Sequence, residues 1–217
     1  MITTPDLIES LVASAEPVPR LRAPVARAAG WLLFAALMLA LLAVARGVRP
    51  DLELRLQQPV FVIGVAAALA TGVLAAIASF IVSLPGRSRG WLFLPLPTLA
   101  VWVATIGYGC LTVWVSIGPG GVSVGETARC FATLVLVGAP LSLALLIMLR
   151  HAALLAPTPV AITGSLAVAA ITATALSLFH DLDASIMIIL WNLGTAALLV
   201  ALGGVFGRRM FSWVAPH

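Results

Sequence analysis

Lysine is absent from this sequence, and charge of either sign is scarce. All twelve basic residues are arginine, the acidic residues number eight, and charged residues make up 9% of the 217 positions. Soluble domains carry roughly 25% charged residues, so an ordinary soluble fold is excluded. The net charge of +4 comes from few charges in total, and it therefore gives no argument for direct nucleic-acid binding.

Cysteine and catalytic motifs are equally scarce. Cys110 and Cys130 are too few for a disulfide framework or a four-ligand metal site. There is no HExxH motif, no phosphate loop and no pair of histidines at ligand spacing. The centres of the long apolar runs lack Asp, Glu, Lys and His, and the hydroxyls that remain, such as Thr71, Thr172 and Thr174, can be satisfied by a helix backbone or a neighbour. We therefore expect no enzymatic activity and no cofactor.

Long apolar runs are what the sequence has in abundance: 62% of its residues are hydrophobic, and the mean hydropathy is +1.14. A helix crosses a bilayer with about 20 residues, and six runs reach that length. The connections between them are short, so the predicted fold class is all-α: a polytopic integral membrane protein with a six-helix transmembrane bundle over 27–209 and a tail at 210–217. The runs lie near 27–46, 60–84, 91–117, 129–149, 159–179 and 185–206.

The placement of arginine predicts how this bundle is oriented, because cytoplasmic loops of membrane proteins are rich in basic residues. One side of the predicted bundle receives eight arginines, whereas the other receives four together with most of the acidic residues. Both termini are therefore expected in the cytoplasm. The eight are Arg20, Arg22, Arg27, Arg87, Arg89, Arg150, Arg208 and Arg209, and the four are Arg46, Arg49, Arg55 and Arg129.

The 26 residues in front of the first run contain a short amphipathic pattern. Thr4 and Pro5 are a favourable helix start, and Pro17 and Pro19 end the pattern, which predicts a helix over about 5–16 and a Pro-rich spacer over 17–24. At 100° per residue the apolar and the acidic side chains fall on opposite sides. The apolar side holds Leu7, Ile8, Leu11, Val12 and Ala15, and the polar side holds Asp6, Glu9, Ser10 and Glu16.

Three interpretations of this helix compete. It could lie flat on the bilayer, but such helices carry basic rather than acidic residues on the polar face. It could fold back on its own bundle, although the Pro-rich spacer holds it away. It could insert its apolar side into a groove of a soluble partner, and the acidic side would then suit a basic protein.

Candidate sensing residues lie on the side opposite the termini. Cys130 follows Arg129 at the start of the fourth run, where a cation and a helix N-terminus favour the thiolate. His180, Asp181 and Asp183 cluster after the fifth run and could ligate a metal with Glu126 or Asp51. A solvated turn, with Asp183 capping the sixth helix, is the simpler interpretation of that cluster, and inert packing is the simpler one for Cys130.

Four short stretches, in this order and spacing within six runs, resemble one known family. They are "DLIESLVASAEPV" at the start, "RPDL" after the first run, "RC" at the fourth, and "LFH…DAS…W" at the fifth-to-sixth turn. The whole chain resembles the NrsF family of six-span membrane anti-sigma factors, which bind extracytoplasmic function (ECF) sigma factors in proteobacteria. The resemblance implies a bacterial inner-membrane protein whose cytoplasmic N-terminal segment holds the sigma factor inactive.

The resemblance also implies a role for outward-facing cysteines in sensing metal or oxidative stress. Cys130 matches the family's cysteine at the start of the fourth run. In many relatives a second cysteine follows the histidine that matches His180, but here that position is Asp181. A two-cysteine switch is therefore incomplete, and a single-thiol mechanism stays open.

The combined prediction is a non-enzymatic anti-sigma factor that contacts the bilayer and a cytoplasmic ECF sigma factor, and releases the latter on envelope or oxidative or metal stress. A small transporter or channel subunit and a membrane scaffold remain as alternatives. The signal-sensing candidates are Cys130, His180 and Asp181. The expected partner-binding residues are Leu7, Ile8, Leu11, Val12, Asp6 and Glu9.

Overall fold

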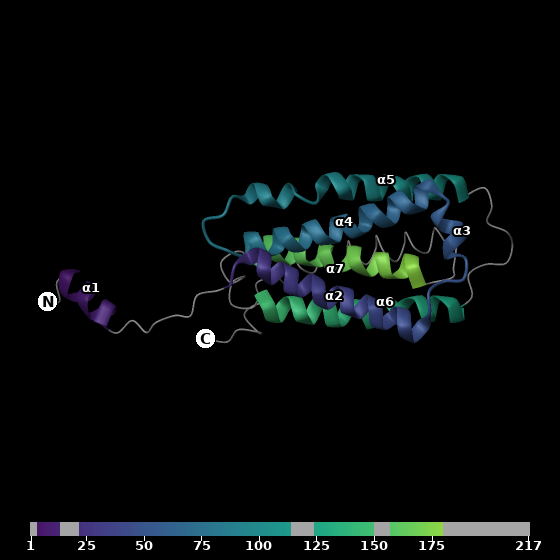
Figure 1. Ribbon diagram of the computed structural model, residues 1–217. Helices are drawn as coiled ribbons and strands as arrows, with labels where there is room; N and C mark the ends of the chain where they lie inside the picture. The colour runs from purple at the N-terminus through teal and green to yellow at the C-terminus, as the bar shows by residue number, and fades with distance from the viewer. Residues whose placement is uncertain (1–3, 14–21, 114–123, 150–156, 180–217) are drawn as a thin grey trace.

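The computed structural model describes residues 4–13, 22–113, 124–149 and 157–179, and within them every regular element is a helix. No strand occurs in these ranges, in agreement with the predicted all-α class. Figure 1 shows the elements in order. They are α1 (Thr4–Ala13), α2 (Pro24–Arg46), α3 (Leu52–Leu56), α4 (Pro59–Val82), the 3-10 helix η1 (Arg89–Phe93), α5 (Leu96–Val113), α6 (Val124–Leu149) and α7 (Pro157–Phe179).

Four of these helical stretches are long and apolar enough to cross a membrane, which is compatible with a membrane protein. They are Pro24–Arg46, Pro59–Val82, Arg89–Tyr108 and Thr158–Phe179. The predicted run at 129–149 falls in α6, whose apolar stretch Val135–Leu149 is shorter. The predicted run at 185–206 lies outside the described residues, so the number six stays a prediction.

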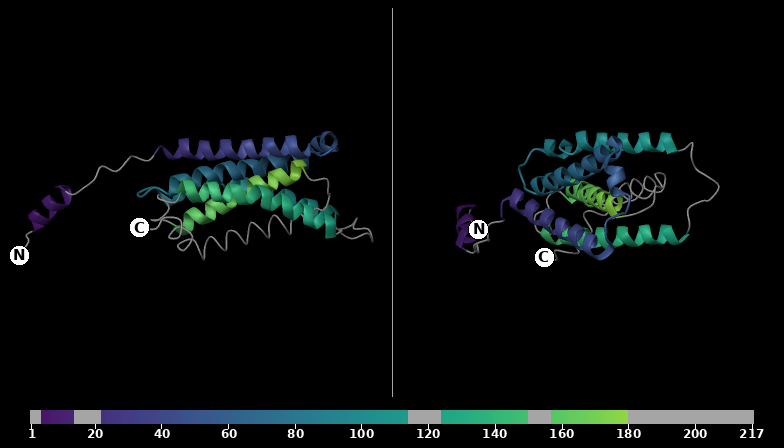
Figure 2. Two further views of the ribbon diagram at one scale, coloured as in Figure 1. Left: turned by 90° about the horizontal axis from the view of Figure 1, so that it is seen from below. Right: turned by 45° about the vertical axis from the view of Figure 1, so that its right-hand side comes forward.

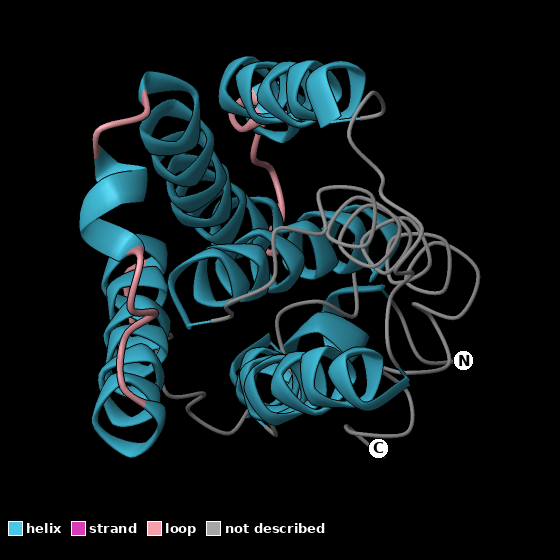
Figure 3. Ribbon diagram, turned by 90° about the vertical axis from the view of Figure 1, so that its right-hand side faces the viewer, coloured by secondary structure: helices cyan, strands magenta, loops and turns pink. Residues whose placement is uncertain are grey.

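The long helices lie side by side along one axis, with α2, α5 and α7 running in one direction and α4 and α6 in the other (Figures 1 and 2). We call the end at which α2 begins the proximal end and the end at which α2 finishes the distal end. α5 packs against α4, α6 packs against α7, and α2 contacts α4, α6 and α7. Figure 3 shows the helices in a view along the axis. Among the helices that the structure describes, α4 and α7 make the most extensive contact.

Small side chains allow α4 and α7 to approach closely. Ala75, Ala76 and Ala78 of α4 are fully buried, as are Ala167 and Ala170 of α7. Because lipid is as apolar as leucine, helices in a bilayer associate through close packing of small residues rather than through the hydrophobic effect. The centre of the bundle therefore depends on close packing of small side chains. A larger side chain there should destabilise it.

Large apolar side chains point outward from the same helices. Leu33 and Val44 of α2, Phe93 of η1, Val101 of α5 and Leu143 of α6 are all exposed. A helix that is apolar on its buried and its exposed sides is typical of a membrane span. The outer surface of the bundle is thus suited to lipid.

Hydroxyl groups inside the bundle are mostly satisfied by their own helix, as the sequence predicted. Thr71 donates to the Ala67 carbonyl at 2.7 Å, and Thr174 donates to the Ala170 carbonyl at 2.9 Å. The exception is Thr172, whose buried hydroxyl has no hydrogen-bond partner among the described residues. Such a group is costly in an apolar interior.

Prolines mark the expected irregularities in the third and fourth runs. Pro95 lies between η1 and α5, so the run predicted as one helix over 91–117 begins as a 3-10 helix and continues as an α-helix. Pro140 lies inside α6, which continues through it. Proline removes one backbone donor and crowds the preceding turn, so both positions interrupt helical hydrogen bonding.

Candidate functional site

The N-terminal helix α1 presents apolar side chains that the fold leaves uncovered. Ile8 is 57% exposed and Val12 is 71% exposed, while Asp6 and Glu9 are exposed on the same short helix. Residues 14–21 join α1 to the bundle, and Figure 1 shows α1 apart from it. The side chains of Leu7 and Leu11 lie outside the described residues, so the full apolar stripe stays a prediction.

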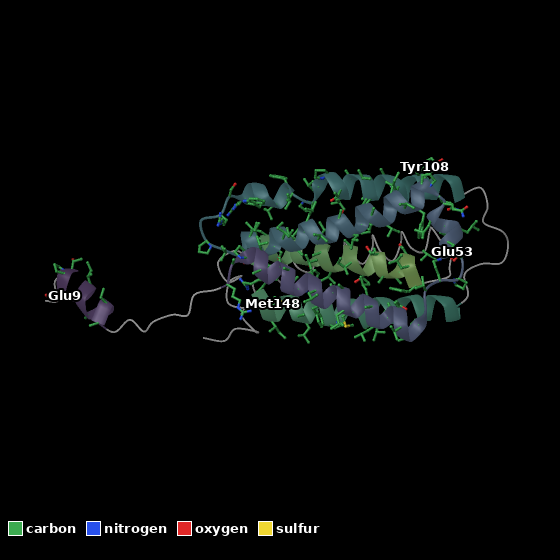
Figure 4. All side chains as sticks on the ribbon, viewed as in Figure 1. Glu9, Glu53, Tyr108 and Met148 are labelled. Carbon is green, nitrogen blue, oxygen red and sulfur yellow. The ribbon has the colours of Figure 1, made fainter. Side chains whose placement is uncertain are left out.

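A basic side chain connects three helices at the proximal end. The Arg27 guanidinium of α2 donates to the Met148 carbonyl of α6 and lies 5.2 Å from the centre of the Phe80 ring of α4. Met148 is labelled at this end in Figure 4. Carbonyls in the last turn of a helix lack intrahelical donors, so Arg27 satisfies a group that α6 cannot satisfy itself. The first turns of α2, which continue from the N-terminal segment, are fixed to α6 in this way.

A second connection between α2 and α6 lies further along both helices. Trp31 is fully buried, and its indole Nε1 donates to the Leu141 carbonyl at 3.1 Å. A buried indole N–H requires such an acceptor. Arg27 and Trp31 are four residues apart and thus lie on one side of α2, which fixes the rotation of this helix against α6.

A compact ionic cluster holds the distal connection between α2 and α3. Arg49 is 6% exposed and forms a bidentate pair with Asp51, at 2.6 Å from Nε to Oδ1 and 2.8 Å from a terminal guanidinium nitrogen to Oδ2. Arg55 donates to the second oxygen at 3.3 Å. The Arg49 backbone N–H also donates to the Leu178 carbonyl of α7 at 3.2 Å. The "RPDL" stretch therefore closes the connection and ties it to the end of α7.

The two guanidinium groups alter the acidity of Asp51. The hydrogen bond from Arg49 is the main cause, and with Arg55 it lowers the pKa of Asp51 from 3.8 to about 2. A bidentate arginine–carboxylate pair favours the charged form in this way. Both carboxylate oxygens of Asp51 are occupied by guanidinium donors, which argues against the role of metal ligand considered for it from the sequence.

Replacing Asp51 with asparagine should lower the thermal unfolding temperature at neutral pH, because the buried Arg49 loses its anion. A lowered pKa contributes stability above the ordinary value of 3.8, and that contribution is lost as the pH falls through about 2. The difference between wild type and Asp51→Asn should thus be constant from about pH 5 to 8 and disappear on acidification.

Thermal unfolding in detergent across this pH range measures the effect. Glu53→Gln, which removes an exposed carboxylate on α3 (Glu53 is labelled in Figure 4), is the matched control and should behave as wild type. A difference that changes between about pH 5 and 8, or that persists below the lowered pKa, would contradict the assignment.

A match to the model of one known family identifies the family of this chain. The family model NrsF, described as negative regulator of sigma F, matches residues 11–213. The chain belongs to the NrsF family. That description implies negative regulation of a sigma factor, and a sigma factor as the partner. No curated protein and no solved structure matches the chain significantly.

The NrsF match covers the whole bundle but only the end of α1. Leu11 and Val12 lie within the matched residues, whereas Asp6, Leu7, Ile8 and Glu9 precede them. Their assignment to partner binding therefore comes from the helical pattern and the exposure of Ile8, and it stays a prediction.

The candidate sensing residues of this NrsF protein are not brought together by the described part of the chain. Cys130 lies in the first half of α6, but its side chain, like that of Cys110, is outside the described residues. His180 and Asp181 are also outside them. Within the described ranges no group of three metal-ligating side chains occurs. The sensing and metal hypotheses therefore remain predictions.

A pattern associated with nucleophilic serines occurs around the start of α6. Residues 121–125 read GVSVG and match the GxSxG pattern of a nucleophile elbow, with Ser123 at its centre. That elbow needs a strand before the serine and a helix after it. Residues 114–123, which would have to supply that strand, lie outside the described residues, so the pattern carries no assignment.

Proposed function

We propose that this chain is an inner-membrane anti-sigma factor that holds an ECF sigma factor through its cytoplasmic N-terminal segment and releases it under envelope or oxidative or metal stress. The observation that carries the proposal is the NrsF match over residues 11–213. The exposed apolar residues Ile8 and Val12 on α1 support the location of the binding segment. Helix-in-groove binding needs such anchors at one-turn spacing.

The experiment is capture of the sigma factor by the full chain. The chain is expressed with each candidate ECF sigma factor of the same organism and extracted in detergent, and co-purification is measured together with a sigma-dependent reporter in cells. The proposal expects co-purification and repression by the full chain. A sigma factor that stays soluble and fully active would overturn the proposal.

The proposed orientation gives a topology prediction. Reporter fusions near Arg22, Ser88 and Arg209 should report the cytoplasm, and those near Asp51 and Gly121 should report the outside. Arg22 and Ser88 adjoin the proximal end, where α2 and η1 begin, and Asp51 adjoins the distal end, where α2 finishes. An N-terminus outside the cytoplasm would put the binding segment out of reach of any sigma factor.

The proposed sensing function gives a second prediction. Cys130→Ser should blunt release of the sigma factor by oxidants or thiol-reactive metals and leave basal repression intact, because the thiolate is the reactive form. Cys110→Ser is the matched control and should respond as wild type. The readout is the sigma-dependent reporter before and after treatment. An unaltered response in Cys130→Ser would show that Cys130 is not the sensor, and would point to His180 and Asp181 or to another molecule.

A further inference from the structure

The connection between α4 and η1 places two arginines on an exposed turn at the proximal end. Gly86 turns the chain with a φ of 80°, and Ser88 accepts a hydrogen bond from the Gly90 N–H at 3.1 Å. Arg87 and Arg89 are both exposed on this turn. Within the part of the chain that the structure describes, neither guanidinium forms a hydrogen bond or an ion pair.

The carboxylates of the described bundle lie at its other end. Asp51 and Glu53 belong to the distal connection, and Glu126 lies in the first turn of α6, which also begins there. Asp6 and Glu9 lie on α1, which Figure 1 shows apart from the bundle. The arginines beside η1 therefore have no acidic neighbour among the described residues of the proximal end.

Two aromatic side chains follow the arginines on the exposed side of η1. Trp91 is 40% exposed and Phe93 is 66% exposed. Leu92 lies between them and packs against the buried cluster that contains Trp31 and Phe80, so the inward side of η1 is already occupied. The indole N–H of Trp91 bonds to none of the described residues and is free to donate to a ligand.

The spacing of these side chains matches the interfacial layer of a bilayer. The candidate span Arg89–Tyr108 begins with η1, and Figure 1 shows α5 following η1 along the bundle axis. A 3-10 helix rises about 2.0 Å per residue, which puts Phe93 roughly 8 Å deeper than Arg89. The headgroup layer on each side of the hydrocarbon is about 5–8 Å thick. Arg89 thus lies at the depth of lipid phosphates when Phe93 lies at the edge of the hydrocarbon.

We propose that Arg87, Arg89, Trp91 and Phe93 form a binding surface for an anionic phospholipid, which we call the η1 surface. The guanidinium groups bind the phosphate through charge-assisted hydrogen bonds, and the two aromatic rings contact the ester groups and upper acyl chains, where such rings are enriched in membrane proteins. A soluble acidic protein would match the arginines alone, whereas a phospholipid matches all four side chains. This binding does not depend on the sigma factor.

Titration of the full chain in neutral detergent with fluorescent phosphatidylglycerol tests the proposal. Wild type should bind this lipid more tightly than phosphatidylcholine with the same fluorophore. Each basic side chain near an anionic lipid surface contributes about 1 kcal/mol, and a tenfold change in affinity takes about 1.4 kcal/mol. Arg89→Gln should therefore weaken binding of phosphatidylglycerol about fivefold, and Arg87→Gln/Arg89→Gln about thirtyfold.

Two variants serve as matched controls. Arg46→Gln removes an exposed arginine from the last turn of α2 at the distal end and should leave the affinity nearly unchanged. Arg87→Lys/Arg89→Lys keeps both charges and should bind nearly as wild type. All the exchanged side chains are exposed, so the thermal unfolding temperature should stay that of wild type.

The position of the lipid is tested by fluorescence quenching. Phosphatidylglycerol with brominated acyl chains should quench wild type more than Trp91→Phe, because Trp91 contacts the lipid. The quenching that depends on Trp91 should disappear in Arg87→Gln/Arg89→Gln. Quenching that is the same with and without Trp91 would place the lipid elsewhere and overturn the proposal.

Equal affinities for the two lipids, or equal losses in Arg46→Gln and Arg89→Gln, would also overturn it. Displacement of the lipid by inorganic phosphate would assign the arginines to a free anion instead. Loss of sigma-factor capture by Arg87→Gln/Arg89→Gln with undiminished lipid binding would assign the η1 surface to the protein partner. Repression by wild type in cells tests the proposed function separately, because none of the lipid measurements requires a sigma factor.

Discussion

Changing Ile8 and Val12 to aspartate should reduce capture of the sigma factor at least a hundredfold while membrane levels of the chain stay normal. The two side chains are 57% and 71% exposed, so the fold loses no packing when they are replaced. Burying one such side chain stabilises a contact by roughly 1.5–3 kcal/mol, and each tenfold change in affinity takes about 1.4 kcal/mol. The loss of two buried side chains therefore accounts for the expected hundredfold loss of affinity. The new carboxylates would weaken binding further, because they would have to be desolvated.

Controls for this prediction are available on the same helix. Ala13→Asp adds a carboxylate next to Val12 but about 100° further round the helix, on the polar side, and should bind nearly as wild type. Glu9→Gln should also have a small effect, because an exposed interface charge contributes little. Co-purification and the sigma-dependent reporter measure the outcome. Undiminished capture by the Ile8→Asp/Val12→Asp variant would show that α1 does not bind the sigma factor.

Gly72→Leu should destabilise the bundle more than Asp51→Asn or any exchange on its outer surface. A Cβ at Gly72 would lie 2.8 Å from Cδ1 of Ile171 and 3.3 Å from its backbone nitrogen, so even the first added carbon meets α7. Overpacking of an interior costs about 1–3 kcal/mol or more. Because the contact of α4 with α7 is the most extensive among the described helices, we expect a lower unfolding temperature and reduced membrane levels.

The matched control is Gly107→Leu on α5. An added Cβ there meets nothing within 4 Å, so the same substitution changes helix propensity without a clash. Thermal unfolding in detergent compares the two variants. In addition, Gly72→Ala combined with Ile171→Val, which removes Cδ1, should cost less than the sum of the single changes. Equal unfolding temperatures for the two leucine variants would show that α4 and α7 are not closely packed.

Helix positions in this bundle were predictable because apolar runs report them directly. The runs at 27–46, 60–84 and 159–179 agree with α2, α4 and α7 to within a few residues. The run at 91–117 begins differently, since Pro95 separates a 3-10 helix from α5. Proline signals an interruption in a sequence but leaves open which type of helix precedes it.

The pairing of helices was not predictable to the same degree. Alanine and glycine are as frequent in the run at 27–46 as in those at 60–84 and 159–179, so composition alone does not single out α4 and α7 as the central pair. Arg27 illustrates the limit at the level of one side chain. The sequence counts it among eight arginines that indicate orientation, whereas the structure connects it to Phe80 and to the Met148 carbonyl. A backbone acceptor has no signature in the sequence.

The joint between α2 and α6 is the pair of hydrogen bonds from Arg27 and Trp31 described above. It constrains which substitutions relatives can accept at these positions. Both of its hydrogen bonds, from Arg27 and from Trp31, end on main-chain oxygens. Any residue at 141 or 148 offers that oxygen, so selection for the joint acts on the donors and leaves the acceptor positions free to drift within their packing. Correlated substitutions at these four positions would therefore report side-chain packing between α2 and α6 and not the two hydrogen bonds. Arginine and tryptophan at one-turn spacing near the start of α2 are the trace that the two hydrogen bonds leave in the sequence.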